Sequence, residues 1–338
     1  MNHKLKYNFL LMLAALIWGS AFVAQSVGMD YLGPFTFNSV RSFMGSLVLL
    51  PVIFFLDRQK KMGEGEAVRE EGDAAGRIAA GKNGKKNGGP DAAWKNAGKA
   101  ASGSDESMQR RRVLITGGVC CGVILTVSTS LQQIGLVYTT AGKAGFITAL
   151  YILIVPLLGL FLGKKVGGKT WVGVALAVVG MYLLCIKEGF SISYGDFMVL
   201  LCAFVFSLHI LTVDYFSPKV DGVRLSCIQF FVCGCLCAVP MVLFERPEIH
   251  QILQAWLPLA YAGVLSSGVA YTLQIITQKH LNPTVASLLM SLESVFAALT
   301  GWLILKERLS PKELLGCVLV FAAIILAQLP EKEKKASA

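Results

Sequence analysis

The sequence predicts an all-α integral membrane protein whose ten transmembrane helices form two inverted five-helix repeats. The chain of 338 residues is 54% hydrophobic and only 15% charged, whereas soluble domains carry about 25% charged residues. Apolar runs long enough to cross a hydrocarbon core recur along the whole chain. One of them, within residues 139–165, has a second copy of the same design within residues 282–308, which lies 142 positions later.

Ten hydrophobic spans can be drawn, most of them close to the length that a helix needs to cross a bilayer. The first span follows Lys4 and Lys6, as in a signal peptide, but it is longer than the apolar region of a signal and further spans follow it. We therefore expect it to remain as the first membrane helix. The spans cover residues 7–27, 33–56, 113–136, 141–162, 171–186, 195–214, 224–244, 256–278, 284–305 and 312–329.

A polar insert, residues 57–112, separates the second span from the third. It holds 22 of the 52 charged residues of the chain, together with ten glycines. Such a composition buries too little apolar surface to offset the entropy of ordering, so we expect disorder with at most a helical turn or two. We interpret it as a tolerated loop expansion, with anionic-lipid binding through Arg110–Arg112 as the alternative. The predicted domains are a first repeat over 1–56 and 113–186, the cytoplasmic insert 57–112, a second repeat over 195–329 and a polar tail over 330–338.

The net charge of +10 is better explained by membrane topology than by a nucleic-acid partner. Nucleic-acid binding requires basic residues gathered on one folded face, whereas here they lie between hydrophobic spans. With both termini in the cytoplasm, inner segments hold 24 Lys/Arg and outer segments hold 6, as the positive-inside rule favours. The loop from Lys306 to Lys312 runs against that rule. We expect a multi-pass protein of the plasma (inner) membrane with cytoplasmic termini and the lipid bilayer as partner, and the oligomeric state stays open.

The nine cysteines lie in or beside apolar runs, where cysteine behaves as a small hydrophobe. Cys233, Cys235 and Cys237 have a spacing that resembles a metal motif. On a helix, however, Cys235 points away from the face that the other two share. The chain contains no paired CxxC motifs or histidine partner to support zinc. We predict no metal site and no cofactor.

The internal repeat extends beyond the first pair of matching spans. Gln132 matches Gln274 at a spacing of 142. Farther upstream, Arg41 matches Gln229 at a spacing of 188, and the difference of 46 is close to the length of the insert. Because five spans are an odd number, the second repeat begins on the opposite side of the membrane. Inverted repeats are typical of transporters whose substrate site lies near the midplane, at the repeat interface.

Further landmarks lie in each half of the chain. They are Ala15–Ser20, Pro34 with Arg41, Gly142–Pro156, Leu281–Pro283, Leu292–Ala297, Lys306–Ser310 and Gly316. Together they resemble EamA-type transporters of the drug/metabolite transporter superfamily. The chain departs from that pattern at Lys165, where glutamate is usual, and at Ser294, where proline is frequent. The resemblance implies a ten-helix secondary transporter that moves small metabolites through a central cavity without ATP hydrolysis.

Polar groups at the middle of a membrane span are costly and mark candidate functional residues. Glu293 is a candidate for proton coupling or for a cationic substrate group, with a structural hydrogen bond as the alternative. His209 can titrate near neutral pH, and its alternative is a packing role. Arg41 is a candidate ligand of a substrate carboxylate or a partner of Asp30. The predicted substrate cavity is lined by Trp18, Arg41, Gln132, Tyr151, His209, Gln229, Tyr271, Gln274 and Glu293, of which Glu293 and His209 are the proton-coupling candidates.

Small residues form a separate stripe on spans four and nine. Small residues four positions apart let two helices approach closely. We therefore expect these spans to pack by one face and to present Tyr151 and Glu293 from another. The stripe consists of Ala141, Gly145, Ala149, Ser287 and Ser291.

These observations predict a secondary-active membrane transporter that works by alternating access around a midplane cavity. Its expected substrate is a small-molecule metabolite, such as an amino acid or a related amphipathic compound, and a proton is the candidate coupling ion. A non-transporting scaffold that uses the insert is the alternative. An intramembrane enzyme lacks support, because the chain has no HExxH or GxSxG motif and its four histidines are scattered. Substrate identity and the direction of transport stay open.

Overall fold

The computed structural model describes residues 3–80, 90–164, 166–185, 193–304 and 310–328. All regular structure in these ranges is helical. The elements are α1 (His3–Gly28), α2 (Pro34–Ala80), α3 (Pro90–Tyr138), α4 (Ala141–Thr148), α5 (Tyr151–Phe161), α6 (Gly168–Cys185), α7 (Tyr194–Phe216), α8 (Gly222–Pro240), the π-helix η1 (Met241–Glu245), α9 (Ile249–Gln254), α10 (Trp256–Ala260), the π-helix η2 (Tyr261–Ala270), α11 (Tyr271–Gln278), α12 (Pro283–Met290), α13 (Leu292–Ile304) and α14 (Pro311–Gln328).

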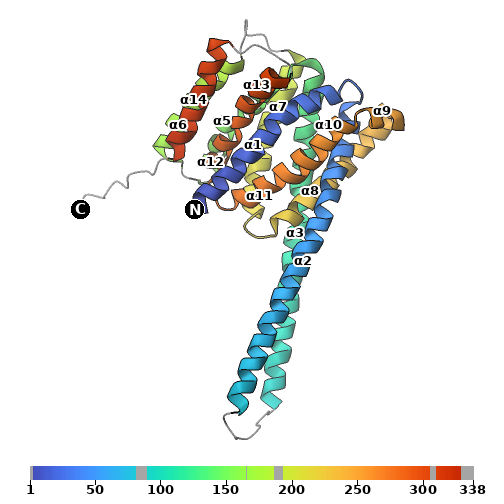
Figure 1. Cartoon of the computed structure of the whole chain (residues 1–338), viewed down its shortest axis with the longest axis vertical. Helices are drawn as coiled ribbons and strands as arrows, with labels where there is room; N and C mark the ends of the chain where they lie inside the picture. Colours follow the sequence, from blue (N-terminus) through green and yellow to red (C-terminus); the bar gives the residue numbers. More distant parts are fainter. Residues whose placement is uncertain (1–2, 81–89, 165, 186–192, 305–309, 329–338) are drawn as a thin grey trace, which may run out of the picture.

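Eight helical segments of the described chain are long and apolar enough to cross a membrane. They correspond to eight of the ten expected spans. The other two expected spans are α6 and α14, whose apolar stretches are shorter, Gly168–Gly180 and Leu314–Ala323. These two helices pack against each other at one edge of the bundle (Figure 1). Large apolar side chains cover much of the outer surface, including Phe54, Phe161 and Phe244, as a protein surrounded by lipid requires.

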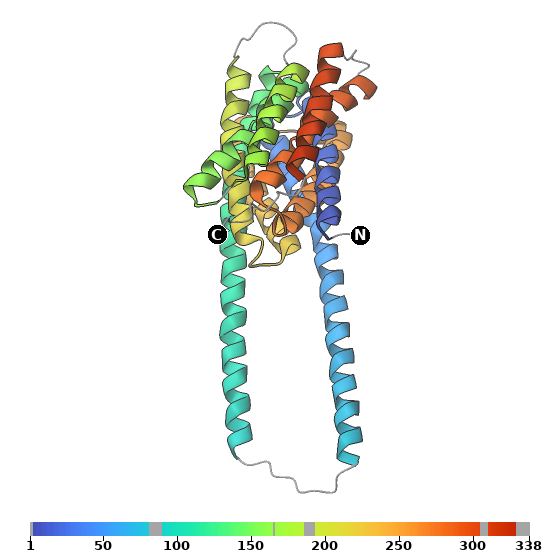
Figure 2. The same ribbon diagram turned by 90° about the vertical axis from the view of Figure 1, so that its left-hand side faces the viewer.

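The insert differs from the expected disorder, because α2 continues to Ala80 and α3 begins at Pro90. Figure 2 shows both helices projecting well beyond the bundle and separated from each other along their projecting parts. Alanine, glutamate, lysine and arginine, which are frequent in these stretches, favour a helix locally. The composition therefore indicated at most a helical turn or two, whereas the helices extend over much longer stretches.

Helices α2 and α8 pack side by side through two matching hydrogen bonds. The Ser39 hydroxyl donates to the Gly234 carbonyl at 3.0 Å, and the Ser46 hydroxyl donates to the Cys227 carbonyl at 3.1 Å. Adding 188 to 39 and 46 gives 227 and 234. When the two halves of the chain are exchanged, each hydrogen bond therefore falls on the position of the other.

Matching contacts also lie at the two ends of this helix pair, where α8 continues into η1. At one end, the Glu245 carboxylate accepts the backbone N–H of Phe35 at 2.9 Å and of Thr36 at 2.6 Å. At the other end, Arg224 Nη2 lies 2.5 Å from Asp57 Oδ1. Residues 36 and 57 again correspond to 224 and 245 at the spacing of 188. The contacts of α2 with α8 and η1 thus fall at the same positions when the two halves of the chain are exchanged.

Spans four and nine, expected as single helices, are each divided in two. Span four is interrupted at 149–150 between α4 and α5, and span nine at Ser291 between α12 and α13. At the first break, the Leu150 N–H donates to the carbonyl of Ile147, three residues back. At the second, the Ser294 N–H donates in the same way to Ser291. These 3₁₀-like bonds explain the interruptions, and such tightening inside a helix often marks a functional hinge.

The stripe of small residues lies close to these breaks. All of it is buried except Ala141, which is half-buried. A methyl group on Gly145 would lie 3.6 Å from Phe22 and Ala297, which is ordinary van der Waals contact. Span four packs against span nine through α4 with α13 and α5 with α12. The hydroxyls of Ser287 and Ser291 donate to carbonyls of their own helix rather than across it.

Candidate functional site

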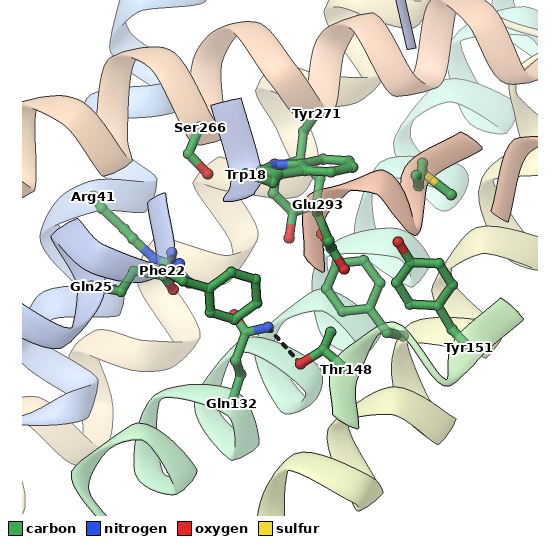
Figure 3. A pocket seen from close by; sticks show the side chains of 12 residues that line it. Trp18, Phe22, Gln25, Arg41, Gln132, Thr148, Tyr151, Ser266, Tyr271 and Glu293 are labelled. Carbon is green, nitrogen blue, oxygen red and sulfur yellow. Dashed lines mark hydrogen bonds between the residues drawn. The ribbon is translucent and has the colours of Figure 1, made fainter. Parts of the chain in front are cut away.

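A buried pocket lies where both broken spans meet α1, α2, α3, α7, η2 and α11. The centres of water molecules can occupy about 20 Å³ of it, which is room for one or two waters. The pocket is therefore nearly closed in this conformation, and a metabolite requires it to widen. Its lining consists of Trp18, Phe22, Gln25, Arg41, Gln132, Thr148, Tyr151, Phe206, Ser266, Tyr271, Met290 and Glu293 (Figure 3).

Local structure explains why these side chains converge. Trp18, Phe22 and Gln25 follow one another at spacings of four and three on α1, so they share one face of that helix. Four further residues belong to the helix ends at the two breaks: Thr148 ends α4, Tyr151 begins α5, Met290 ends α12 and Glu293 stands in the first turn of α13. Transporters commonly build their sites from such discontinuous helices.

One end of the pocket carries a buried positive charge. The side chain of Arg41 is only 4% exposed, and its Nη1 donates to Gln25 Oε1 at 2.9 Å. Its guanidinium carbon also lies 5.7 Å from the centre of the Phe37 ring. The suggested pairing with Asp30 does not occur, because Arg41 takes the neutral Gln25 instead. A guanidinium has five N–H donors, so Arg41 keeps capacity for an anionic ligand.

The opposite end of the pocket carries a buried carboxyl group. Glu293 is 5% exposed and Tyr151 is 2% exposed, and Figure 3 shows the two side chains together, away from Arg41 and Gln25. The Glu293 Oε1 and Tyr151 hydroxyl oxygens are buried without a hydrogen-bond partner within the protein. A helix N-terminus favours a nearby carboxylate, which explains how α13 accommodates Glu293 at this depth.

Aromatic rings form the wall between the two ends. The Tyr271 ring lies 4.8 Å from Trp18 and 6.0 Å from Phe206, between ring centres. Phe206 in turn lies 6.3 Å from Tyr151. Such rings provide a large apolar surface, and the tryptophan and tyrosine rings add a polar atom at one edge. The pocket thus combines a guanidinium and a carboxyl group, set apart from each other, with an aromatic wall.

Six of the nine residues expected in the cavity line this pocket. They are Trp18, Arg41, Gln132, Tyr151, Tyr271 and Glu293. The other three, His209, Gln229 and Gln274, are fully buried outside its lining. The remaining lining residues were not predicted from the sequence: Phe22, Gln25, Thr148, Phe206, Ser266 and Met290. Helical spacing from Trp18 was a usable signal for Phe22 and Gln25, and the same spacing from Tyr151 and Glu293 was one for Thr148 and Met290. The repeat spacing of 188 relates Phe206 to Trp18, whereas Ser266 offered no signal.

Ion pairs hold span four against α7 at both of its ends. Lys143 Nζ lies 2.6 Å from Asp196 Oδ2, and Lys164 pairs with Asp214. Asp196 also accepts hydrogen bonds from Thr139 and from the backbone of Ser193. These contacts fix the position of Tyr151 between the two ends. Within the described residues, no group of three or more His, Cys, Asp or Glu side chains is placed to hold a metal ion.

Comparison with known proteins gives consistent matches over most of the chain. The EamA-like transporter family matches residues 5–68, 101–186 and 193–329. An uncharacterized transporter of Archaeoglobus fulgidus is 29% identical over 320 residues, which cover 94% of this chain and 84% of that protein. The uncharacterized transporter YoaV of Bacillus subtilis is 21% identical over 92% of both chains. These names indicate transporters rather than enzymes.

Two further comparisons agree with this result. A chloroplastic WAT1-related protein of Arabidopsis thaliana is 27% identical over 58% of this chain and 50% of its own. One solved crystal structure shares the fold, with a TM-score of 0.67 and 17% identity over 96% of each chain. The chain belongs to the EamA-like transporter family of the drug/metabolite transporter superfamily, and it is a multi-pass membrane transporter of small molecules.

Proposed function

We propose that this protein is a secondary-active transporter of small zwitterionic metabolites, such as amino acids or related amphipathic compounds. The observation that carries the proposal is a guanidinium and a carboxyl group in one buried pocket, Arg41 at one end and Glu293 at the other. Among the described residues, no ion pair joins these two side chains to each other. Buried charges need partners, and a ligand that carries both charges supplies both at once.

The chemistry of each end suggests how such a ligand is oriented. The planar fork of a guanidinium suits a carboxylate, so Arg41, positioned by Gln25, receives the carboxylate of the substrate. Glu293 receives its ammonium group, beside the unpartnered Tyr151 hydroxyl. The aromatic wall of Trp18 and Tyr271 then packs against the apolar part of the metabolite.

Alternating access between two inverted five-helix repeats is the mechanism that we propose. The reciprocal contacts of α2 and α8 support it, because they have the same form when the halves are exchanged. The breaks in spans four and nine also support it, since they stand 142 positions apart. A pocket with room for only one or two waters fits an occluded state, from which either side of the membrane is reached by opening one half.

Proton coupling and orientation complete the proposal. Glu293 is the coupling group, because a carboxyl at membrane depth can bind either a proton or a cation, and it can exchange one for the other. The start of α1 and the end of α14 lie toward the side from which α2 and α3 project (Figure 1). This arrangement supports both termini and the insert on the cytoplasmic face of the plasma membrane.

The test is a flux assay with purified protein in liposomes. A panel of amino acids, their decarboxylated amines and their deaminated acids is offered with and without a proton gradient. We expect flux of amino acids, and at least roughly ten-fold less flux of analogues that lack one charge, because each loses a charge-assisted hydrogen bond. Equal flux of amines or acids contradicts the zwitterion, and flux that ignores the proton gradient contradicts the coupling.

A further inference from the structure

Behind the aromatic wall lies a second group of buried polar side chains. The group, here called the polar seam, consists of His209 on α7, Gln229 on α8, and Gln274 and Gln278 on α11, each at most 1% exposed. None of the four lines the pocket. A polar group of this kind costs stability unless it is hydrogen-bonded, so its presence calls for a physical explanation.

Few of the polar atoms in the seam find partners within the protein. His209 Nε2 lies 3.1 Å from Gln229 Oε1, and Gln278 Nε2 donates weakly to the Ile210 carbonyl at 3.4 Å. Five atoms have no partner: His209 Nδ1, Gln229 Nε2, both amide atoms of Gln274, and Gln278 Oε1. A cluster of unpaired groups this large is typical of a place that holds water or ligand.

The seam runs away from the pocket along one face of α11. Tyr271, Gln274 and Gln278 follow at spacings of three and four, which places them on one face. Tyr271 closes the near end, because its ring lies 6.2 Å from His209 and 5.2 Å from Phe230, as well as against Trp18. Gln278 is the last residue of α11. The seam thus leads from the aromatic wall to the end of this helix.

The internal repeat relates the seam to the pocket. Gln229 occupies in the second half the position of Arg41 in the first, and Gln274 occupies that of Gln132. Arg41 and Gln132 both line the pocket. Moreover, Arg41 bonds Gln25 on the first helix of its repeat, as Gln229 bonds His209 on the first helix of the other. Two seam residues, Gln229 and Gln274, are therefore the counterparts of two pocket residues in the opposite half of the chain.

We propose that the polar seam is the second half of the transport pathway, which fills with water and receives the polar groups of the substrate when Tyr271 swings aside. This inference rests on the proposed function. In the conformation described above, the pocket half is formed and the seam is shut. In the opposite conformation, His209, Gln229, Gln274 and Gln278 take the place of the pocket residues, and water satisfies their unpaired atoms.

The test measures opening without the need for a substrate. Gln274→Cys and Gln278→Cys variants in lipid nanodiscs are treated with a small charged methanethiosulfonate reagent, and modification at each cysteine is followed by peptide mass spectrometry. Native Cys121, fully buried in an apolar cluster, is the internal control. A minor open state is commonly 0.1–10% populated, and the introduced thiols are exposed to the reagent in that state whereas Cys121 stays in its apolar cluster. We therefore expect the introduced thiols to react at least roughly ten-fold faster than Cys121. Adding Tyr271→Ala, or Tyr271→Leu if the alanine variant unfolds, increases that rate further.

Each result decides between the two proposals. Introduced thiols that react no faster than Cys121 overturn the seam, even where amino-acid flux is found. Modification that appears only after Tyr271 is replaced also overturns it, because the native chain then keeps the seam shut. Rapid modification without flux of any metabolite leaves the seam standing and contradicts the proposed function instead. As a second measurement, Gln274→Leu is expected to keep or raise the melting temperature and to reduce flux, whereas a dry seam leaves flux unchanged.

Discussion

Tyr151 and Glu293 stand at the same point of two broken spans and face one pocket. Each lies in the first turn of the helix that follows its break, 142 positions from the other. Both are buried, and both have an oxygen atom without a partner in the protein. At corresponding positions of the repeat, the first half therefore contributes a phenol to the pocket and the second half contributes a carboxyl group. This difference makes the two halves of the site chemically distinct.

Glu293→Gln is expected to remove the pH dependence of transport while the fold is kept. The amide has the shape of the carboxyl but neither binds a proton nor pairs with an ammonium group. We expect flux of a zwitterionic substrate to fall roughly ten- to hundred-fold, since hydrogen bonds to charged groups contribute about 1.5–3 kcal/mol. Liposome flux between pH 5.5 and 8 (roughly the range in which proton coupling is visible) measures this, and Ser294→Ala is the control. A pH dependence that persists unchanged in Glu293→Gln excludes Glu293 as the coupling group.

Replacing Arg41 together with its partner separates ligand binding from stability. In the double variant Arg41→Met, Gln25→Leu, apolar groups of similar shape replace both hydrogen-bonded groups, and such exchanges are nearly neutral or stabilising. We expect a melting temperature equal to or above that of the wild type, and loss of substrate carboxylate recognition. Thermal unfolding and flux on one protein preparation measure both. A large drop in melting temperature with flux retained shows instead that Arg41 is structural.

Gly19 is expected to tolerate no side chain. A Cβ atom there lies 2.5 Å from the Phe296 Cβ and 2.6 Å from the carbonyl oxygen of Glu293, so α1 and α13 must separate. We expect Gly19→Ala to destabilise by about 1–3 kcal/mol through overpacking. Gly145→Ala is the matched control, because its Cβ meets neighbours only at 3.6 Å. Equal melting temperatures for the two variants contradict the close contact at Gly19.

Two contacts with α2, from Glu245 of η1 and from Arg224 of α8, are expected to differ in strength. Glu245 accepts three hydrogen bonds at the start of α2, two from backbone N–H groups and one from the Thr36 hydroxyl. Losing such a cap costs about 0.5–2 kcal/mol. The Arg224–Asp57 pair has both side chains 44% exposed, and exposed pairs contribute about 0–1 kcal/mol. We expect Glu245→Ala to lower the melting temperature more than Asp57→Ala, and the reverse order contradicts this assignment.

The sequence predicted the internal repeat better than it predicted the directions of the buried side chains. The spacing of 142 predicted that Tyr151 and Glu293 hold corresponding positions, because the two copies of a duplicated segment keep a constant separation. The contacts between α2 and α8 were not predicted from the sequence, although their residues follow the spacing of 188. Hydropathy gave the depth of His209 and Gln274 but not the direction of their side chains, which depends on how each helix is rotated by its neighbours. The breaks at 149–150 and Ser291 carry neither proline nor glycine, so no local signal marked them.

The outer part of the insert is expected to be dispensable for transport. The matched family leaves residues 69–100 uncovered, and the projecting helices lie outside the bundle (Figure 2). Deleting 69–100 keeps Asp57 and its pairing with Arg224, so the packed helices lose no contact described above. We expect unchanged melting temperature and flux, and rapid amide hydrogen exchange over 69–80 and 90–100 in the intact chain, because helices without tertiary packing open readily. Loss of flux with the fold intact indicates instead that the insert takes part in transport, and capture of a specific partner by the insert alone favours the scaffold alternative.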